Sequence, residues 1–498
     1  MYRQPTVAQI TLTPASRAAI GERTAAFRAK HDLPSVVLGV ASGSDLVHMA
    51  AAADPAEPVP TADTVFRIAS MTKSFTAAAV LILRDRGRVR LDDPVAFHVP
   101  ELAGLAGPTA DSPPITIRHL LSMAGGMASD DPWADRLLDA DATTMDALFG
   151  DGAAFATAPG GFSYSNFGYA MLGRVVTNVA GMPFQDVITD ELLIPLGLAA
   201  TTWTPPPAGS VAPPYWRVDD VLTREPVLGD GGFAAMGGLW STARDLARWC
   251  GWMLDAFPPR DDPDDPILAR ASRREMQLVA NAIPPRVTPT DDGTRVSAGG
   301  YGFGLNVVVD SHLGLVVQHS GGLPGYGSHM AWLPQRGVAA VALANSRYAP
   351  ARNLTREVLD LLVQADAAPV RAPTPPVALT AAATALVALL NDWSDAVADT
   401  LFSFNVGLDD ALERRRRIAA ERRSEHGPLI IRTVSARNLA EADVQVVDGR
   451  GTSMTLALML SPEPTATVQW YELREPNDSA AEEPPERRHD DRRRGSAP

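Results

Sequence analysis

Ser70 and Lys73 lie three residues apart in an alanine-rich apolar stretch, FRIASMTKSFTAAAVLILRDRG, which spans residues 66–87. The stretch predicts a buried helix, and residues three apart lie on one face of a helix, about 4.5 Å apart along its axis. A serine hydroxyl is a weak nucleophile that needs a base to accept its proton. A lysine partly removed from water has a lowered pKa and can serve as that base. The pair therefore predicts an activated serine nucleophile; the alternative is a helix-capping serine beside an exposed lysine.

Two further polar stretches could complete such a site. Tyr164 and Asn166 lie in FSYSNFGYAM, directly before a predicted helix. The stretch QHSGG (318–322) ends a predicted strand, where small residues allow a backbone to approach a ligand closely. Each stretch also has a purely structural interpretation: a half-buried tyrosine ring, an N-cap asparagine, and a strand histidine with satisfied hydrogen bonds.

The three blocks S-x-x-K, Y-x-N and H-x-G, in this order and spacing, resemble the serine β-lactamase-like superfamily. Within it they are similar to the branch that holds class C β-lactamases, DD-peptidases, D-aminopeptidases and related carboxylesterases. The intervening stretches ITIRHLLSMAGGM and AMGGLWSTARDLARW also resemble that family, and the resemblance covers roughly residues 15–365. It implies an α/β (α+β) β-lactamase/transpeptidase-like fold, with an antiparallel sheet flanked by helices plus a helical subdomain.

The resemblance also implies a role for each residue. Ser70 attacks the substrate carbonyl and is acylated, while Lys73 and Tyr164 share the proton transfers. Tyr164 would act as base towards the serine and as acid towards the leaving group, with its phenolate favoured by a cationic Lys73. Asn166 would hold Lys73 and a substrate amide, and the backbone N–H groups of Ser70 and Gly322 would form an oxyanion hole. Neither metal nor cofactor is implied; the candidate site residues are Ser70, Lys73, Tyr164, Asn166, His319, Ser320, Gly321 and Gly322.

The third block departs from the family pattern, which reads Lys-Thr/Ser-Gly in true β-lactamases. A neutral His319 donates one hydrogen bond, whereas a lysine supplies a permanent charge for a substrate carboxylate. We therefore expect a serine hydrolase of esterase type, acting on small carboxylic esters or amides. The alternatives are a D-aminopeptidase or DD-peptidase-type amidase, a weak β-lactamase, and a catalytically silent binding protein. An acid in the pocket, from Asp230 or from DDPDDP (261–266), would favour a substrate with a free amine.

Composition restricts the partners. The 498 residues include 44 basic and 58 acidic side chains, and the net charge of −14 argues against nucleic acid. The single cysteine, Cys250, excludes an internal disulfide framework. No signal peptide and no run of 18 apolar residues is visible, which predicts a cytoplasmic protein without a membrane partner. We expect a small-molecule ester or amide as substrate, and a homodimer is possible.

The chain organisation predicts a serine hydrolase domain (1–366), a proline-rich linker (367–378), a small α+β domain (379–474) and a disordered tail (475–498). The arginine run at 413–423 is interrupted by glutamates and predicts a solvated helix face. GYGFGLN (300–306) precedes no helix, so it predicts a strand or turn and not a nucleotide loop. Apolar periodicity predicts helices at 15–31, 115–123, 167–181, 242–257, 354–365, 380–400 and 408–424, and strands at 36–42, 45–53, 314–322, 327–334, 337–346, 429–434, 443–448, 453–460 and 466–473.

Overall fold

The chain forms two compact units that divide between Val370 and Arg371, inside the predicted linker. The predicted tail 475–498 lies outside the described residues. The computed structural model describes residues 10–151, 153–206, 209–219, 221–260, 262–290, 293–371 and 375–474.

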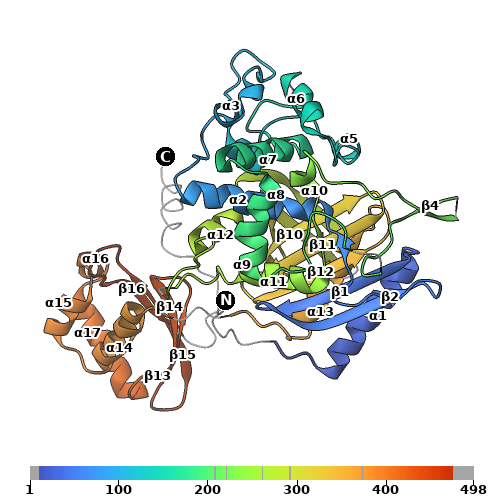
Figure 1. Ribbon diagram of the computed structural model, residues 1–498. Coiled ribbons are helices and arrows are strands. Elements are labelled where there is room, and N and C mark those ends of the chain that lie inside the picture. The colour runs from blue at the N-terminus through green and yellow to red at the C-terminus, as the bar shows by residue number, and fades with distance from the viewer. Residues whose placement is uncertain are drawn as a thin grey trace, which may run out of the picture. The chain divides into compact units, whose positions relative to one another are not determined.

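An eight-stranded antiparallel sheet is the centre of the N-terminal unit (Figure 1). Its strand order is β2-β1-β12-β11-β10-β9-β8-β7, so the first hairpin of the chain pairs with the last strand of the unit. The strands are β1 (Ser35–Ser42), β2 (Asp45–Ala53), β7 (Asn281–Thr290), β8 (Gly293–Tyr301), β9 (Asn306–Asp310), β10 (Gly314–Leu323), β11 (Tyr326–Leu333) and β12 (Val338–Ala344).

Helices cover both faces of this sheet, which is why every residue of β11 and β12 is buried. Side chains alternate along β12: Val341 and Leu343 share a core with α2, α7 and α11, while Ala340 and Ala342 pack with α1 and α13. These five helices are α1 (Pro14–Lys30), α2 (Thr72–Asp85), α7 (Asn166–Ala180), α11 (Ala243–Leu254) and α13 (Ala351–Gln364).

A helical region surrounds α2 and α7, with α3, α5 and α6 at the top of Figure 1. All α2 residues from Thr72 to Leu83 are buried, which confirms the predicted buried helix. The remaining elements of this unit are η1 (Ala69–Met71), α3 (Val95–His98), η2 (Pro100–Leu102), α4 (Ile117–Leu121), α5 (Asp131–Ala134), α6 (Ala142–Gly150), α8 (Phe184–Ile188), η3 (Thr189–Leu193), α9 (Ile194–Leu196), α10 (Ala234–Gly237) and α12 (Arg270–Met276), with the two short pairs β3 (Phe66–Arg67) and β6 (Trp240–Ser241), and β4 (Tyr215–Val218) and β5 (Val221–Arg224).

The C-terminal unit places helices on one face of an antiparallel sheet with the order β13-β14-β15-β16 (Figure 1). The single helix predicted at 380–400 is wrong, because Asp392 is extended (φ −146°, ψ 94°) and ends α14. The Asn391 side chain binds the backbone N–H and C=O of Leu429 at 2.7 and 2.9 Å, which holds the break in place. The elements are α14 (Val377–Asn391), α15 (Asp395–Leu401), α16 (Phe404–Asp409), α17 (Leu412–His426), β13 (Ile430–Ala436), β14 (Glu441–Val447), β15 (Ser453–Leu460) and β16 (Val468–Arg474).

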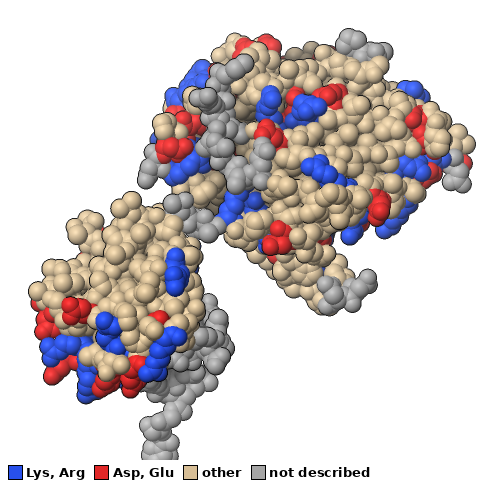
Figure 2. All heavy atoms as spheres, turned by 90° about the horizontal axis from the view of Figure 1, so that it is seen from below, with Lys and Arg blue, Asp and Glu red and all other residues tan. Residues whose placement is uncertain are grey.

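Most other predicted elements are confirmed, including the strands β1, β2, β10, β11 and β12 and the helices α1, α7, α11 and α13. GYGFGLN joins β8 to β9 as predicted. Arginines of α17 form ion pairs with acids, such as Arg416 with Asp395 at 3.2 Å, as expected for a solvated face. Figure 2 shows basic and acidic side chains side by side over the C-terminal unit. No helix within the described ranges is long and apolar enough to cross a membrane.

Candidate active site

Ser70 lies in the short 3₁₀ helix η1, which runs directly into α2. The preceding residue, Ala69, has φ 49°, in the left-handed region that non-glycine residues rarely adopt. Such local strain is found at functional sites, where the surrounding structure must hold it. Here the Ser328 hydroxyl of β11 donates a hydrogen bond to the Ile68 carbonyl at 2.9 Å. The turn that presents Ser70 is therefore tied to the central sheet.

Glycines 321 and 322 allow β10 to approach this turn. A Cβ added to Gly321 would lie 2.2 Å from the Ile68 carbonyl oxygen, so no other residue fits without displacing the strand. A Cβ on Gly322 would lie 2.7 Å from the ring of Tyr348. The H-x-G block thus brings strand backbone beside Ser70, as the predicted oxyanion hole requires.

Lys73 is fully buried and makes three hydrogen bonds. Its ammonium donates to Ser70 Oγ at 2.9 Å, to Asn166 Oδ1 at 2.7 Å and to the Met236 carbonyl at 2.8 Å. Burial lowers the pKa of Lys73 to about 8, although nearby carboxylates, Asp131 foremost, oppose the shift. The predicted lowering of the Lys73 pKa is therefore confirmed, and a minor neutral fraction is present near neutral pH.

Tyr164 shares a hydrogen bond with Ser70, and its ring centroid lies 5.0 Å from Lys73 Nζ. Burial, followed by the charge of Asp131, raises the pKa of Tyr164 well above its ordinary value. The prediction that Lys73 would favour the phenolate is therefore wrong, because desolvation dominates. Tyr164 is a neutral phenol that can donate a proton.

Asn166 is the first residue of α7, and its amide is fully engaged within the protein. Its Oδ1 accepts from Lys73, while its Nδ2 donates to Asp131 at 2.7 Å and to Asp130 at 3.2 Å. The N-cap of α7 is Ser165, whose hydroxyl accepts from the backbone N–H of residue 168. The predicted contact with Lys73 is confirmed, but the donors expected to bind a substrate amide are occupied.

His319 is buried and neutral, because burial and then the charge of Lys73 lower its pKa to about 3. Its Nδ1 lies 2.5 Å from the Ser320 carbonyl, so this nitrogen carries the proton and donates. Its Nε2 then accepts from the Tyr301 hydroxyl at 2.9 Å. The one donor of His319 is thus used within the protein, and the ring provides neither a charge nor a free N–H to a substrate.

A cavity of about 360 Å³ brings the predicted residues together. Lys73 and Asn166 lie behind its wall, where they contact Ser70 and each other. Sequence reasoning missed nine of the fifteen lining residues, among them Asp131, Asp135, Asn306, Tyr348 and Arg352. The predicted residues that line it are Ser70, Tyr164, His319, Ser320, Gly321 and Gly322.

The acids come from SDDPWAD (129–135), which has three carboxylates in seven residues; this density was the available sequence signal. Asp130 accepts from the backbone N–H groups of residues 166 and 167, both at 2.8 Å, and so fixes the start of α7. Asp135 accepts from the Tyr348 hydroxyl at 2.6 Å. Burial raises the pKa of Asp135 to about 6, against the lowering effect of the Tyr348 hydrogen bond.

The acids expected from sequence lie elsewhere. Asp230 is within 3.3 Å of the Gln185 amide, and it does not line the cavity. Asp261 lies outside the described residues, while Asp262 and Asp265 form ion pairs with arginines near α12. The expectation that Asp230 or the described residues of 262–266 supply a pocket acid is therefore wrong, although the cavity does contain acids.

Arg352, near the start of α13, is the one cationic residue among those that line the cavity in the described part of the chain. Burial lowers its pKa, and the neighbouring Arg356 and Arg286 add to the effect. Because the third block carries no lysine, Arg352 is the lining residue that can bring a positive charge to the cavity.

Comparison with known proteins identifies the family. The Beta-lactamase family model matches residues 20–365. AmpH of Escherichia coli (strain K12), a D-alanyl-D-alanine-carboxypeptidase/endopeptidase, is 28% identical over 313 residues, which are 61% of this chain and 77% of AmpH. Penicillin-binding protein 4 of Amycolatopsis lactamdurans is 29% identical over 375 residues, which are 68% of this chain and 88% of that protein.

Two solved structures share the fold. The octameric penicillin-binding protein homologue from Pyrococcus abyssi aligns with a TM-score of 0.57 at 20% identity, over 92% of this chain and 99% of the other. A D-stereospecific amidohydrolase from Streptomyces sp. aligns with a TM-score of 0.56 at 23% identity, over 68% of this chain and 97% of the other. The two structures show the fold alone, whereas the family model matches residues 20–365, more than half of the chain, and so shows that the chain belongs to the Beta-lactamase family of serine hydrolases.

Proposed function

We propose that this chain forms an acyl-enzyme on Ser70 and cleaves small D-amino-acid amides, dipeptides and related esters that carry a free amine. The observation that supports this substrate class is the acidic lining of the cavity, where Asp131 and Asp135 lie with Ser70. These carboxylates accept hydrogen bonds from Asn166 and Tyr348, and an ester without an amine, which the sequence favoured, would bring no positive charge to them.

The balance of charge supports a cationic substrate group. Three carboxylates, those of Asp130, Asp131 and Asp135, act on the buried Lys73. Backbone N–H groups stabilise Asp130, and the Lys73 ammonium balances one further charge. The remaining carboxylate, Asp135, accepts a hydrogen bond from the Tyr348 hydroxyl, and a substrate ammonium would add a positive charge beside it.

Lys73 is the proposed base in the first step. In its neutral form, two N–H groups donate to Asn166 and Met236, and the lone pair faces the Ser70 hydroxyl at 2.9 Å, within the range for proton transfer. Ser70 Oγ bonds to the substrate carbonyl carbon as its proton passes to Lys73. When the bond to the leaving group breaks, that group takes the Tyr164 proton, which the Lys73 ammonium replaces.

Water completes the cycle. Its oxygen bonds to the acyl carbon while one of its protons passes to neutral Lys73. The bond to Ser70 Oγ then breaks, the acid product leaves, and Lys73 returns the proton to Ser70. The backbone N–H groups of Ser70 and Gly322 are the proposed donors to the oxyanion, each worth about 2.7–4 kcal/mol in such sites.

The names of relatives support the D configuration, since AmpH is a D-alanyl-D-alanine-carboxypeptidase/endopeptidase and the Streptomyces neighbour a D-stereospecific amidohydrolase. The second candidate is an esterase for small uncharged esters. It is favoured by the neutral His319, which offers no charge to a substrate carboxylate.

The test compares four chromogenic substrates with Ser70→Ala as the blank: D-alanine p-nitroanilide, its N-acetyl derivative, L-alanine p-nitroanilide and p-nitrophenyl butyrate. We expect kcat/KM to be about 10- to 100-fold higher for the free amine than for the N-acetyl compound, the range of a hydrogen bond to a charged group. The D isomer should exceed the L isomer.

The other outcomes contradict the proposal. Equal rates with and without the N-acetyl group, or turnover of the butyrate ester alone, would establish the esterase. Dominant turnover of a chromogenic cephalosporin would indicate a β-lactamase. No turnover, together with no labelling of Ser70 by a serine-directed phosphonate, would indicate a binding protein.

Arg352→Met tests the proposed contact with a carboxylate. We expect KM for D-alanyl-D-alanine to rise about tenfold, because a charged hydrogen bond is lost, while D-alaninamide is unaffected. The matched control is Arg356→Met, on the same helix but not lining the cavity. Release of D-alanine is the measurement, and equal changes for the two substrates would exclude this role for Arg352.

A further inference from the structure

Tyr348 lines the Ser70 cavity, although no proton transfer of the proposed mechanism uses it. It lies between β12 and α13, and its φ of 49° is in the left-handed region that a tyrosine rarely adopts. Strain of this kind persists only where the surrounding structure holds it, and it is concentrated at functional sites. A role for this side chain in the cavity would explain why the strained conformation is kept.

Contacts on both sides of the turn hold Tyr348 in this conformation. Its backbone N–H donates to the Tyr326 carbonyl at the start of β11, at 3.1 Å. The preceding residue, Arg347, donates its N–H to the Tyr215 carbonyl at 2.9 Å. The Arg347 guanidinium lies over the Trp216 ring, 3.6 Å from its centroid. The turn is thus attached to β11 and β4, and the origin of the Tyr348 side chain is fixed.

The Tyr348 ring joins two walls of the cavity. On the wall formed by β10, a Cβ added to Gly322 would lie 2.7 Å from Cδ1 of the ring. On the opposite side, the Tyr348 hydroxyl donates to Oδ2 of Asp135 at 2.6 Å, directly after α5. Burial, followed by the hydrogen bond to Asp135, raises the pKa of Tyr348, so the hydroxyl keeps the proton that it donates.

The two partners of this hydrogen bond differ in exposure. Asp135 is 4% exposed, whereas Tyr348 is 49% exposed. One part of the Tyr348 ring therefore faces the solvent while another part lines the cavity. A half-exposed ring that contacts a buried carboxylate forms a wall between that carboxylate and the solvent.

We propose that Tyr348 is a specificity-determining residue that closes the cavity at the amine end of the substrate. This inference rests on the proposed function, in which Asp135 is a partner of the substrate ammonium. An ammonium beside Asp135 has the Tyr348 ring as its neighbour, so a bulky substituent on the nitrogen would meet the ring. The chain would then act as an aminopeptidase on amino-acid amides and dipeptides, and would exclude peptides that extend beyond the amine.

The test uses amines that keep the positive charge and differ only in size: D-alanine p-nitroanilide and its N-methyl and N-benzyl derivatives. For the wild type we expect kcat/KM to fall about 10- to 100-fold from the free amine to the N-benzyl compound, the usual effect of an overpacked contact. Tyr348→Gly removes the ring and suits the positive φ. It should raise kcat/KM for the N-benzyl compound about tenfold or more relative to the free amine.

Tyr348→Phe is the matched control, because it keeps the ring and removes only the hydroxyl; it should keep most of the preference for the free amine. If Tyr348→Gly does not fold, as judged by circular dichroism, Tyr348→Asn replaces it, since asparagine also tolerates this backbone conformation. Equal turnover of the free amine and the N-benzyl compound by the wild type would overturn the proposal. A preference that Tyr348→Gly leaves unchanged, or that both variants lose equally, would do the same.

The N-acetyl derivative of D-alanine p-nitroanilide, which lacks the charge, separates this proposal from the proposed function. Wild-type turnover of the N-acetyl compound as fast as that of the free amine would contradict the role of Asp135 as partner of an ammonium. Slow turnover of the N-acetyl compound together with fast turnover of the N-benzyl compound would contradict only the size limit at Tyr348.

Discussion

Replacing Lys73 by methionine should lower kcat/KM by about 10²- to 10⁴-fold, the usual contribution of a general base. The wild-type kcat/KM for an uncharged ester should rise with pH through an apparent pKa near 8, because in the proposed mechanism only neutral Lys73 accepts the Ser70 proton. At pH 7 roughly a tenth of the molecules carry the neutral Lys73 amine. Below pH 8 we therefore expect kcat/KM to fall by about tenfold for each pH unit. The measurement is the pH dependence of kcat/KM for p-nitrophenyl butyrate.

Tyr164→Phe separates the two proton-transfer groups. This variant should have a lower kcat/KM, but kcat/KM should still rise with pH through an apparent pKa near 8. The reason is that Lys73 still titrates there, whereas the pKa of the Tyr164 phenol is raised well above its ordinary value. In Lys73→Met the residual activity should lose this rise with pH. A rise that survives in Lys73→Met, or disappears in Tyr164→Phe, would assign the base to Tyr164 and contradict the mechanism.

Replacing Asp135 by asparagine should change activity and stability in opposite directions. For a free-amine substrate we expect KM to rise at least tenfold, because the anionic partner of the ammonium is lost. Stability at pH 8 should increase by about 1–3 kcal/mol, because a carboxylate whose pKa is raised by burial is unfavourable when ionised. Asparagine retains an acceptor for the Tyr348 hydroxyl, so the contact between these two segments can persist.

The pH dependence of this effect has a definite sign. The folded pKa of Asp135, about 6, exceeds the ordinary value of 3.8, so the folded state binds the proton more tightly than the unfolded state. Stability from this group is complete below pH 4 and is lost as pH rises to 6 and beyond. The gain in Asp135→Asn should therefore be present at pH 8 and vanish near pH 4.

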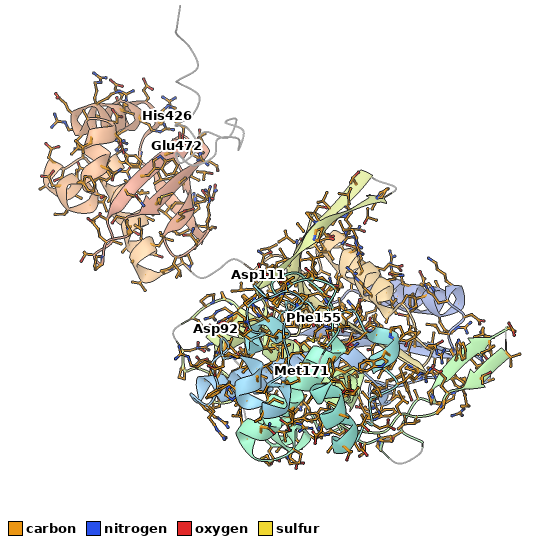
Figure 3. The ribbon with its side chains drawn as sticks, turned by 90° about the horizontal axis from the view of Figure 1, so that it is seen from above. Asp92, Asp111, Phe155, Met171, His426 and Glu472 are labelled. Atoms are coloured by element: carbon orange, nitrogen blue, oxygen red, sulfur yellow. The ribbon has the colours of Figure 1, made fainter. Side chains whose placement is uncertain are left out.

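Thermal unfolding at the two pH values is the measurement, and Asp111→Asn is the control. Asp111 is exposed, on a loop of the N-terminal unit that Figure 3 labels. This variant should change neither the melting temperature nor KM. A melting temperature for Asp135→Asn that falls at pH 8, or a KM equal to the wild type, would show that Asp135 is a structural carboxylate and not a substrate contact.

The sequence by itself determined the local chemistry. Ser70 and Lys73 meet because a spacing of three on one helix leaves little choice, whatever surrounds them. Strands β10 to β12 followed from their apolar pattern, and the absence of a permanent charge at position 319 followed from a histidine standing where the family has a lysine. The ordered motifs indicated the family, which the match over residues 20–365 confirms. Short-range geometry and residue type decide such features, so they can be read along the chain.

Only the tertiary structure decided which distant groups share the cavity. Asp131, Asp135, Tyr348 and Arg352 are separated from Ser70 by 60 or more residues, and their approach depends on how α5 and the start of α13 pack beside the sheet. The pKa of Tyr164 was predicted in the wrong direction because burial, a property of the whole fold, outweighs one neighbouring charge. The break between α14 and α15 depends on Asn391 binding Leu429, 38 residues away. The polar groups of a cavity are brought together by such long-range contacts, which have no signature in local spacing.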